Sequence, residues 1–150
     1  MPVTIRSATL EDVPAILALE QSAPGAAHWT SEQYNKLVDS GVVLVAEEPE
    51  KAGKLCGFLC AKAVAGEWGI ENVAVSAELL RRGIANELVR ELIHRATNDA
   101  ASAILLEVRE SNLPARRLYE KHGFRKVGRR VLYYRDPVED AILYALRFDR

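Results

Sequence analysis

The strongest constraint on the fold is a change of hydrophobic period between residues 70 and 109. Residues 70–75, which follow the turn at 66–69, predict a strand, and the mostly apolar residues 103–109 predict a second one. Between them, apolar residues recur at helical spacing from Ile84 to Ala96. A strand, a helix of this length and another strand form a βαβ unit. We therefore expect two parallel neighbouring strands with the helix packed on one face.

The remaining segments alternate between predicted helices and strands. Strands are expected around residues 3–5, 42–46, 55–64, 125–134 and 141–148, and helices from residue 13, from residue 31 and over 113–121. Thr9, followed three residues later by Asp12, resembles a capping signal for the first helix. The charged turn at 47–54 favours an antiparallel hairpin, and residues 66–69 are expected to turn into the strand at 70–75. The pattern predicts one α+β domain, residues 1–150, around a mixed sheet.

Charge and cysteine usage exclude several classes of protein. Twenty Lys and Arg against 21 Asp and Glu leave a net charge of −1, so we expect no direct nucleic-acid binding. Cys56 and Cys60 are four strand residues apart, about 13 Å, which is too far for a disulfide. No signal-peptide pattern or long apolar run is found, which predicts a cytoplasmic chain with no membrane contact. No group of His, Cys and carboxylate residues has the sequence spacing typical of metal ligands, so no metal is expected.

The turn before the predicted helix carries residues suited to a diphosphate. Arg81, Arg82 and Gly83 lie between the strand that ends at Val75 and the helix that begins near Ile84. The first N–H groups of a helix have no internal partner, and the helix dipole adds partial positive charge there. Gly83 would allow a ligand to approach the backbone closely. The alternative is an ordinary solvated turn, and the turn alone does not decide between them.

The same turn resembles the acetyl-CoA-binding motif of the GNAT acyltransferase superfamily, which is Gln or Arg, two variable residues, Gly, one residue, then Gly or Ala. Residues 80–85 match it except at Leu80, where the family usually has Gln or Arg. Residues 106–124 resemble the second signature of the superfamily, closest to the ribosomal-protein-alanine N-acetyltransferases. Arg130, the Tyr133–Tyr134 pair and the His28–Trp29 segment fit further patterns of that family. The resemblance implies a central, mixed, mostly antiparallel sheet flanked by about four helices.

The resemblance assigns catalytic roles to two residues. Glu107 would be the general base, and its apolar surroundings in the sequence would favour that role by desolvation. The alternative is an exposed Glu107 that pairs with Arg109. Tyr119 would protonate the departing thiolate of CoA, or it is a core aromatic of its helix. Pattern alone does not separate these alternatives.

Binding roles also follow from the resemblance. The main chain of the strand end would hold the pantetheine arm and the acetyl carbonyl, a form of oxyanion stabilisation, and Asn112 would contact CoA while also capping its helix. Independently of the resemblance, the Trp29 and Tyr133–Tyr134 segments carry aromatic residues on connections and would flank a peptide acceptor, or they serve only for packing. The full expected cofactor set is Val73, Ala74, Val75, Arg81, Arg82, Gly83, Ile84, Ala85, Asn86, Asn112 and Tyr119.

The function expected from the resemblance is transfer of an acetyl group from acetyl-CoA to a primary amine by direct attack. The preferred acceptor is a peptide N-terminus, with an N-terminal alanine of a ribosomal protein as the implied partner. One alternative keeps the chemistry and uses a small amine, such as an amino acid or a polyamine. Another is a non-catalytic acyl-CoA-binding module.

Overall fold

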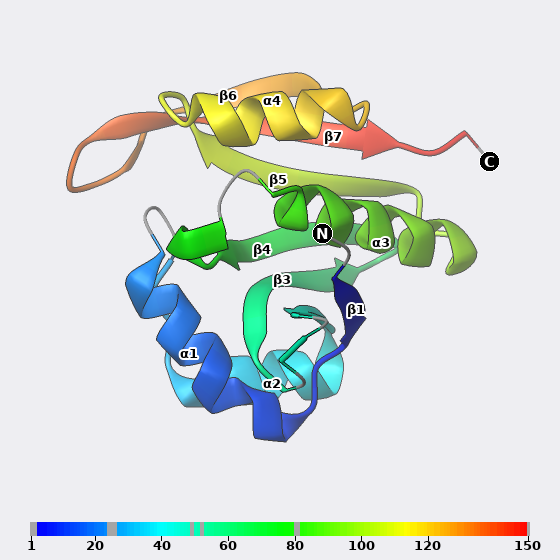
Figure 1. The fold of residues 1–150 in the computed structure, drawn as a ribbon. Coiled ribbons are helices and arrows are strands. Elements are labelled where there is room, and N and C mark those ends of the chain that lie inside the picture. The colour runs from blue at the N-terminus through cyan, green and yellow to red at the C-terminus, as the bar shows by residue number, and fades with distance from the viewer. Residues whose placement is uncertain (1–2, 24–26, 49, 52, 80–81, 150) are drawn as a thin grey trace.

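The computed structural model describes residues 3–23, 27–48, 50–51, 53–79 and 82–149. Within these ranges the sheet has seven strands in the order β1-β2-β3-β4-β5-β7-β6 (Figure 1). The strands are β1 Thr4–Ser7, β2 Val42–Glu47, β3 Leu55–Val64, β4 Glu67–Val75, β5 Ala103–Arg109, β6 Arg125–Tyr134 and β7 Glu139–Arg147. The helices are α1 Val13–Ser22, α2 Ser31–Ser40, α3 Ile84–Asn98 and α4 Leu113–Lys121, with short 3-10 turns at Leu10–Asp12 and Ala77–Leu79.

The predicted βαβ unit is present. β4 and β5 are parallel, and α3 connects them, while the other neighbouring pairs in the described sheet are antiparallel. The expected class, a mixed and mostly antiparallel sheet with helices on it, is confirmed. No helix in the described part of the chain is long and apolar enough to cross a membrane.

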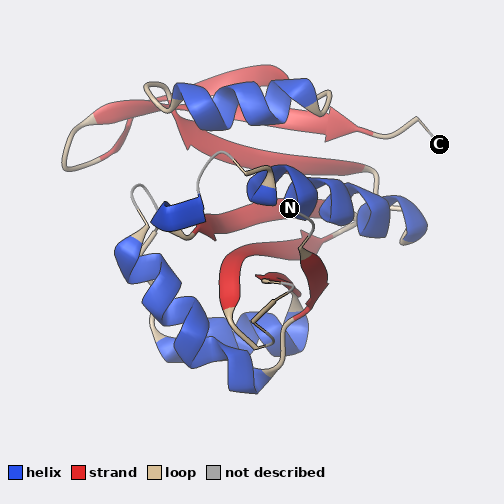
Figure 2. Cartoon of the chain, viewed as in Figure 1, coloured by secondary structure: helices blue, strands red, loops and turns tan. Residues whose placement is uncertain are grey.

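Helices cover both faces of the sheet (Figure 2), and the buried apolar residues form one cluster on each face. Leu44 and Ala46 of β2 belong to the cluster beneath α3 and α4, whereas Val43 and Val45 belong to the cluster beneath α1 and α2. This alternation follows from the two-residue period of a strand. Cys56 and Cys60 are buried free thiols, as predicted.

Two strands begin earlier than predicted. β4 starts at Glu67 rather than at residue 70, so Trp68 and Gly69 are strand residues. The reason is a tight hairpin turn at Ala65 and Gly66, whose φ angles of 52° and 82° let the chain reverse within two residues. β7 likewise starts at Glu139 instead of residue 141.

β4 and β5 separate soon after they pair. Their ladder covers only Glu67–Gly69 opposite Ala103–Leu105. On its other edge β4 carries a bulge, because Asn72 faces Cys60 and Ile70 faces Ala61, leaving Glu71 without an opposite residue. The described ladder between β4 and β5 therefore ends at Gly69, and a space opens between the two strands beyond it.

Candidate active site

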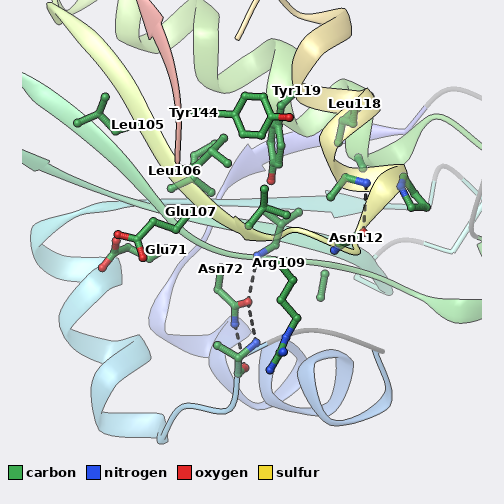
Figure 3. A pocket seen from close by; sticks show the side chains of 18 of the residues that line it. Glu71, Asn72, Leu105, Leu106, Glu107, Arg109, Asn112, Leu118, Tyr119 and Tyr144 are labelled. Atoms are coloured by element: carbon green, nitrogen blue, oxygen red, sulfur yellow. Dashed lines mark hydrogen bonds between the residues drawn. The ribbon is translucent and has the colours of Figure 1, made fainter. Parts of the chain in front are cut away.

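A groove of about 1260 Å³ lies where β4 and β5 diverge. Figure 3 shows Glu71 and Glu107 on one side of it and Asn112 on the other, with Tyr119 between them. The groove brings together residues from β4, α3, β5 and α4 that are far apart in sequence. The predicted site residues that line it are Val73, Ala74, Val75, Gly83, Ile84, Ala85, Asn86, Glu107, Asn112 and Tyr119. Arg82 is exposed and is not among the lining residues, and Arg81 lies outside the described residues.

The main chain of β4 presents hydrogen-bond donors to this groove. Ser76 donates its N–H to the Cys56 carbonyl of β3 at 2.8 Å. Since hydrogen-bonded pairs alternate along an antiparallel ladder, Val73 and Val75 direct their N–H groups away from β3, toward β5. No β5 strand pairs with them there, because the ladder has already ended. The geometry therefore supplies backbone donors of the kind that stabilise an oxyanion.

The N-terminus of α3 supplies a second group of donors. Gly83 caps the helix with φ of 79°, a left-handed conformation that glycine adopts without strain. The first bond of the helix runs from the Glu87 N–H to the Gly83 carbonyl, so the preceding N–H groups have no partner within the helix. These groups and the helix dipole lie at the end of the groove and are suited to an anion.

Gly57 allows α3 to approach the sheet closely, and the sequence analysis did not identify it. A Cβ at this position would lie 3.0 Å from Cγ2 of Ile84 and 3.2 Å from the Ala74 carbonyl. A side chain there would push the first turn of α3 away from the end of β4. A lone glycine inside an apolar strand was the available signal, since it often marks a close backbone contact.

Asn86, in the first turn of α3, is held by α4. His122 caps the C-terminus of α4, and its Nε2 donates to Oδ1 of Asn86 at 2.7 Å. Burial lowers the pKa of His122, which favours the neutral ring. The contact links the two helix ends that border the groove.

Glu107 lies on β5 with its side chain 30% exposed, so it is not enclosed by the apolar residues around it in sequence. Its carboxylate accepts a hydrogen bond from Nε of Arg130 at 3.0 Å. A hydrogen bond to Glu107 also raises the pKa of Tyr133. The carboxylate is therefore oriented by two residues of β6, and the desolvated setting expected from the sequence is wrong.

Arg109 does not pair with Glu107. Its guanidinium contacts Glu139 at 3.3 Å and lies 4.5 Å from the ring centre of Tyr134. It also donates to the Arg135 and Pro137 carbonyls at 3.0 and 2.9 Å. Arg109 thus anchors the β6–β7 loop beside the groove, leaving the Glu107 carboxylate to Arg130 and Tyr133.

Tyr119 is both a core residue and a groove residue. It is 6% exposed and packs against Phe124 with ring centres 5.5 Å apart. Burial raises its pKa to about 12, so the phenol keeps its proton near neutral pH and is able to donate it. The two alternatives drawn from the sequence are compatible in this geometry.

Asn112 begins α4 at the rim of the groove. Its side chain accepts from the Ala115 N–H at 3.2 Å, which is the N-cap bond that the sequence predicts. Its exposed side chain also lines the groove, so it is placed to contact a ligand there.

The aromatic residues expected near the acceptor are divided between two cavities. Tyr133 and Tyr134 line the groove, and their rings meet edge to face at 5.2 Å. Trp29 instead lines a smaller cavity of about 260 Å³ beside α2. Glu71, the bulged residue of β4, lines both cavities. Trp29 therefore lies near the groove without being part of its wall.

A buried polar network connects the loop between α1 and α2 to β4, and it was missed in the sequence analysis. Tyr34 donates to Glu20, and Asn72 donates to the Tyr34 hydroxyl at 3.0 Å. Glu20, Tyr34 and Asn72 are 2%, 0% and 6% exposed. The available signal was the position of Glu20, four residues after Ile16 on the buried face of α1.

Comparisons with known proteins agree with this geometry. The sequence profile of the Acetyltransferase (GNAT) family matches residues 10–124. A ribosomal protein bS18-alanine N-acetyltransferase of Escherichia coli K12 is 32% identical over 145 residues, which cover 95% of this chain and 96% of that protein. The crystal structure of the ribosomal-protein-S18-alanine N-acetyltransferase from Escherichia coli superposes with a TM-score of 0.87 at 30% identity, covering 99% of this chain and 96% of that one. Arabidopsis thaliana NAA60 in complex with acetyl-CoA shares the fold, with a TM-score of 0.88 at 21% identity over 98% and 100% of the two chains.

Proposed function

The chain belongs to the acetyltransferase (GNAT) family and is an N-acetyltransferase, and we propose that it transfers the acetyl group of acetyl-CoA to the α-amine of a protein N-terminus. The observation that carries the proposal is the convergence of Glu107, Tyr119 and the β4 main chain on one groove. These three features match the needs of acyl transfer to an amine, which are a base, an acid and a donor for the carbonyl oxygen.

The residues around the groove fit acetyl-CoA as the acyl donor. The free N–H groups at the start of α3, preceded by Gly83, suit the diphosphate. The divergence of β4 from β5 leaves the Val75 N–H available to an extended pantetheine arm and directs the Val73 N–H toward the acetyl carbonyl. Leu80, which departs from the usual motif, lies outside the described residues, and the proposal rests on backbone donors instead.

Each catalytic group has one step in the proposed reaction. Glu107 takes a proton from the ammonium form of the acceptor, whose pKa is near 8, so that the neutral amine attacks the thioester carbonyl. The carbonyl oxygen becomes an oxyanion, and the Val73 N–H donates to it. When the carbon–sulfur bond breaks, Tyr119 gives its proton to the thiolate. The attacking nitrogen then loses its second proton, which restores the Tyr119 phenol through solvent, and Glu107 releases the proton it took from the ammonium group. The products are the N-acetylated acceptor and free CoA.

A peptide N-terminus is the proposed acceptor, with the alanine of a ribosomal protein as the first candidate. The E. coli relative that is 32% identical is named for this acceptor. In this chain the acceptor would enter between the β6–β7 loop and the α1–α2 loop, where Tyr133 is half exposed. An open side of this kind suits a chain that continues beyond its first residue.

The acceptor is tested by incubating the protein with acetyl-CoA and a panel of peptides and small amines. Thiol release reports turnover, and mass spectrometry identifies the product. The expected result is acetylation of alanine-initiated peptides and loss of turnover in Glu107→Gln. Acetylation of amino acids or polyamines with no peptide modified would establish the small-amine alternative, and acetyl-CoA binding without turnover would establish a binding module.

A further inference from the structure

Asn72 uses its whole hydrogen-bonding capacity inside the protein, and Figure 3 shows its bonds to Ala27 and Val73. Its Nδ2 donates to the Ala27 carbonyl at 3.1 Å and to the Tyr34 hydroxyl at 3.0 Å. Its Oδ1 accepts from the Ala27 N–H at 3.2 Å and from the Val73 N–H at 3.1 Å. An amide side chain has two donors and an oxygen with two lone pairs, so no further bond is available to it.

One side of this arrangement fixes residues 27–30, the described part of the loop between α1 and α2 that precedes α2. Both polar groups of the Ala27 backbone are bonded to Asn72. Two residues further on, the Trp29 N–H donates to the buried carboxylate of Glu20 at 3.0 Å, and the Trp29 ring packs against Tyr34 at 5.3 Å. Asn72 therefore holds the described end of this loop against β4.

On its other side, Asn72 occupies the Val73 N–H, a donor that the proposed reaction needs. The Val73 N–H faces the groove, and in the proposed function it donates to the acetyl carbonyl. In the structure it donates to Oδ1 of Asn72. The same oxygen thus contacts the acyl-binding strand and the acceptor loop.

We propose that Asn72 is a positioning residue that couples acyl-group binding to residues 27–30 of the α1–α2 loop, because its Oδ1 and the acetyl carbonyl compete for the Val73 N–H. The inference rests on the proposed use of acetyl-CoA. When the acetyl group is bound, Oδ1 gives up the Val73 N–H and keeps only the Ala27 N–H. Oδ1 of Asn72 is then shared by one donor fewer, and its bond to the Ala27 N–H changes. Acetyl-CoA, unlike free CoA, therefore alters the hydrogen bonding of the loop.

The competition predicts an unusual effect of removing the side chain. In Asn72→Ala the Val73 N–H has no internal acceptor, so acetyl-CoA binds without displacing one. The ratio of the dissociation constant for CoA to that for acetyl-CoA should rise about three- to tenfold, which corresponds to one ordinary hydrogen bond. A merely structural defect would weaken both ligands and would not raise this ratio.

Tyr34→Phe is the matched control. It removes a hydroxyl from the same network and leaves Glu20 with one donor fewer, but it leaves Oδ1 of Asn72 in place. We expect it to lower the melting temperature while keeping the CoA to acetyl-CoA ratio within about twofold of the wild type. Asn72→Val, which fills the site with a β-branched apolar residue, provides the same test if Asn72→Ala does not fold.

Trp29 gives a direct readout of the loop. The chain has two tryptophans, so Trp68→Phe leaves Trp29 as the sole tryptophan reporter. In this background acetyl-CoA should change Trp29 emission more than CoA does, and Asn72→Ala should remove the difference.

Calorimetric titration with CoA and with acetyl-CoA measures the two dissociation constants and tests both the coupling and the proposed function. The coupling is supported by two results together. The ratio of the CoA to the acetyl-CoA dissociation constant rises in Asn72→Ala, and the acetyl-dependent change in Trp29 emission occurs only when Asn72 is present. An unchanged or lower ratio, or equal Trp29 signals from both ligands when Asn72 is present, overturns the coupling and leaves the proposed function intact. Failure of the wild-type chain to bind acetyl-CoA would overturn both.

Discussion

The Glu107 carboxylate on β5 accepts a hydrogen bond from Nε of Arg130 on β6, 3.0 Å away, across the intervening strand β7. The Arg130 guanidinium also lies 5.5 Å from the ring centre of Tyr133. The edge strand β6 therefore orients the proposed base. The carboxylate is 30% exposed and lines the groove, which is the position that the proposed reaction requires of a base.

Glu107→Gln should lower kcat strongly and leave cofactor binding unchanged. The amide has nearly the same shape but cannot take the proton of the acceptor. Loss of a general base typically costs about 10²- to 10⁴-fold in rate. The rate of CoA thiol release at saturating substrate gives kcat, and calorimetry measures acetyl-CoA affinity. Turnover within about threefold of the wild type would remove Glu107 from the mechanism.

Tyr119→Phe should lower kcat by about 10²-fold or more while changing stability little, since the ring still packs against Phe124. Burial raises the Tyr119 pKa to about 12. The proton therefore remains on the phenol up to a pH well above 10, and no loss of wild-type rate through Tyr119 should occur below that pH. A rate profile and a thermal melt test both statements. An alkaline loss of rate near pH 9 that disappears in Tyr119→Phe would contradict this role.

Gly83→Ala should destabilise the chain by about 1 kcal/mol and weaken acetyl-CoA binding. The site has open space for a Cβ, so the cost comes from the left-handed φ of 79°. Gly128→Ala is the control, because its Cβ would make only an ordinary contact with Leu143 at 3.9 Å. Urea unfolding and calorimetry measure the two effects. Equal results for the two variants would show that the conformation of Gly83 has no role in binding.

His122 should make the protein less stable as the pH falls. Burial lowers its pKa in the folded protein, so below about pH 6.5 the unfolded chain takes up this proton first. Stability is therefore retained above pH 6.5 and lost as the pH falls toward the folded pKa. Urea unfolding at pH 7.5 and 5.5 should show a smaller loss for His122→Gln than for the wild type. The same pH dependence in both proteins would assign it to other groups.

Much of the fold could be predicted because local period determines local structure. The βαβ unit, α2 and α4 follow from helical or alternating spacing together with cap residues such as Asn112. The start of β4 could not be predicted from the sequence. The turn consists of Ala65 and Gly66 alone, so the strand begins directly after it, before Trp68. The bulge at Glu71 also has no signal of its own in the sequence.

The site was predictable where a motif places residues on one element, and less so where partners meet across the sheet. Glu107 and Tyr119 line one groove as expected. The partner of Glu107 is Arg130, 23 residues away, rather than the nearby Arg109 that the strand period suggested. Asn72 and Tyr34, 38 residues apart, meet only because α2 packs against the sheet. Such contacts depend on tertiary structure, which local period does not encode.

The most direct test of the account uses a peptide that begins with alanine and also contains an internal lysine. After incubation with acetyl-CoA, fragmentation mass spectrometry locates the acetyl group, and thiol release gives the stoichiometry. The account predicts one acetyl group on the N-terminal α-amine, one CoA released for each, and loss of both in a Glu107→Gln, Tyr119→Phe double variant. Acetylation confined to the lysine, or undiminished acetylation by the double variant, would contradict it.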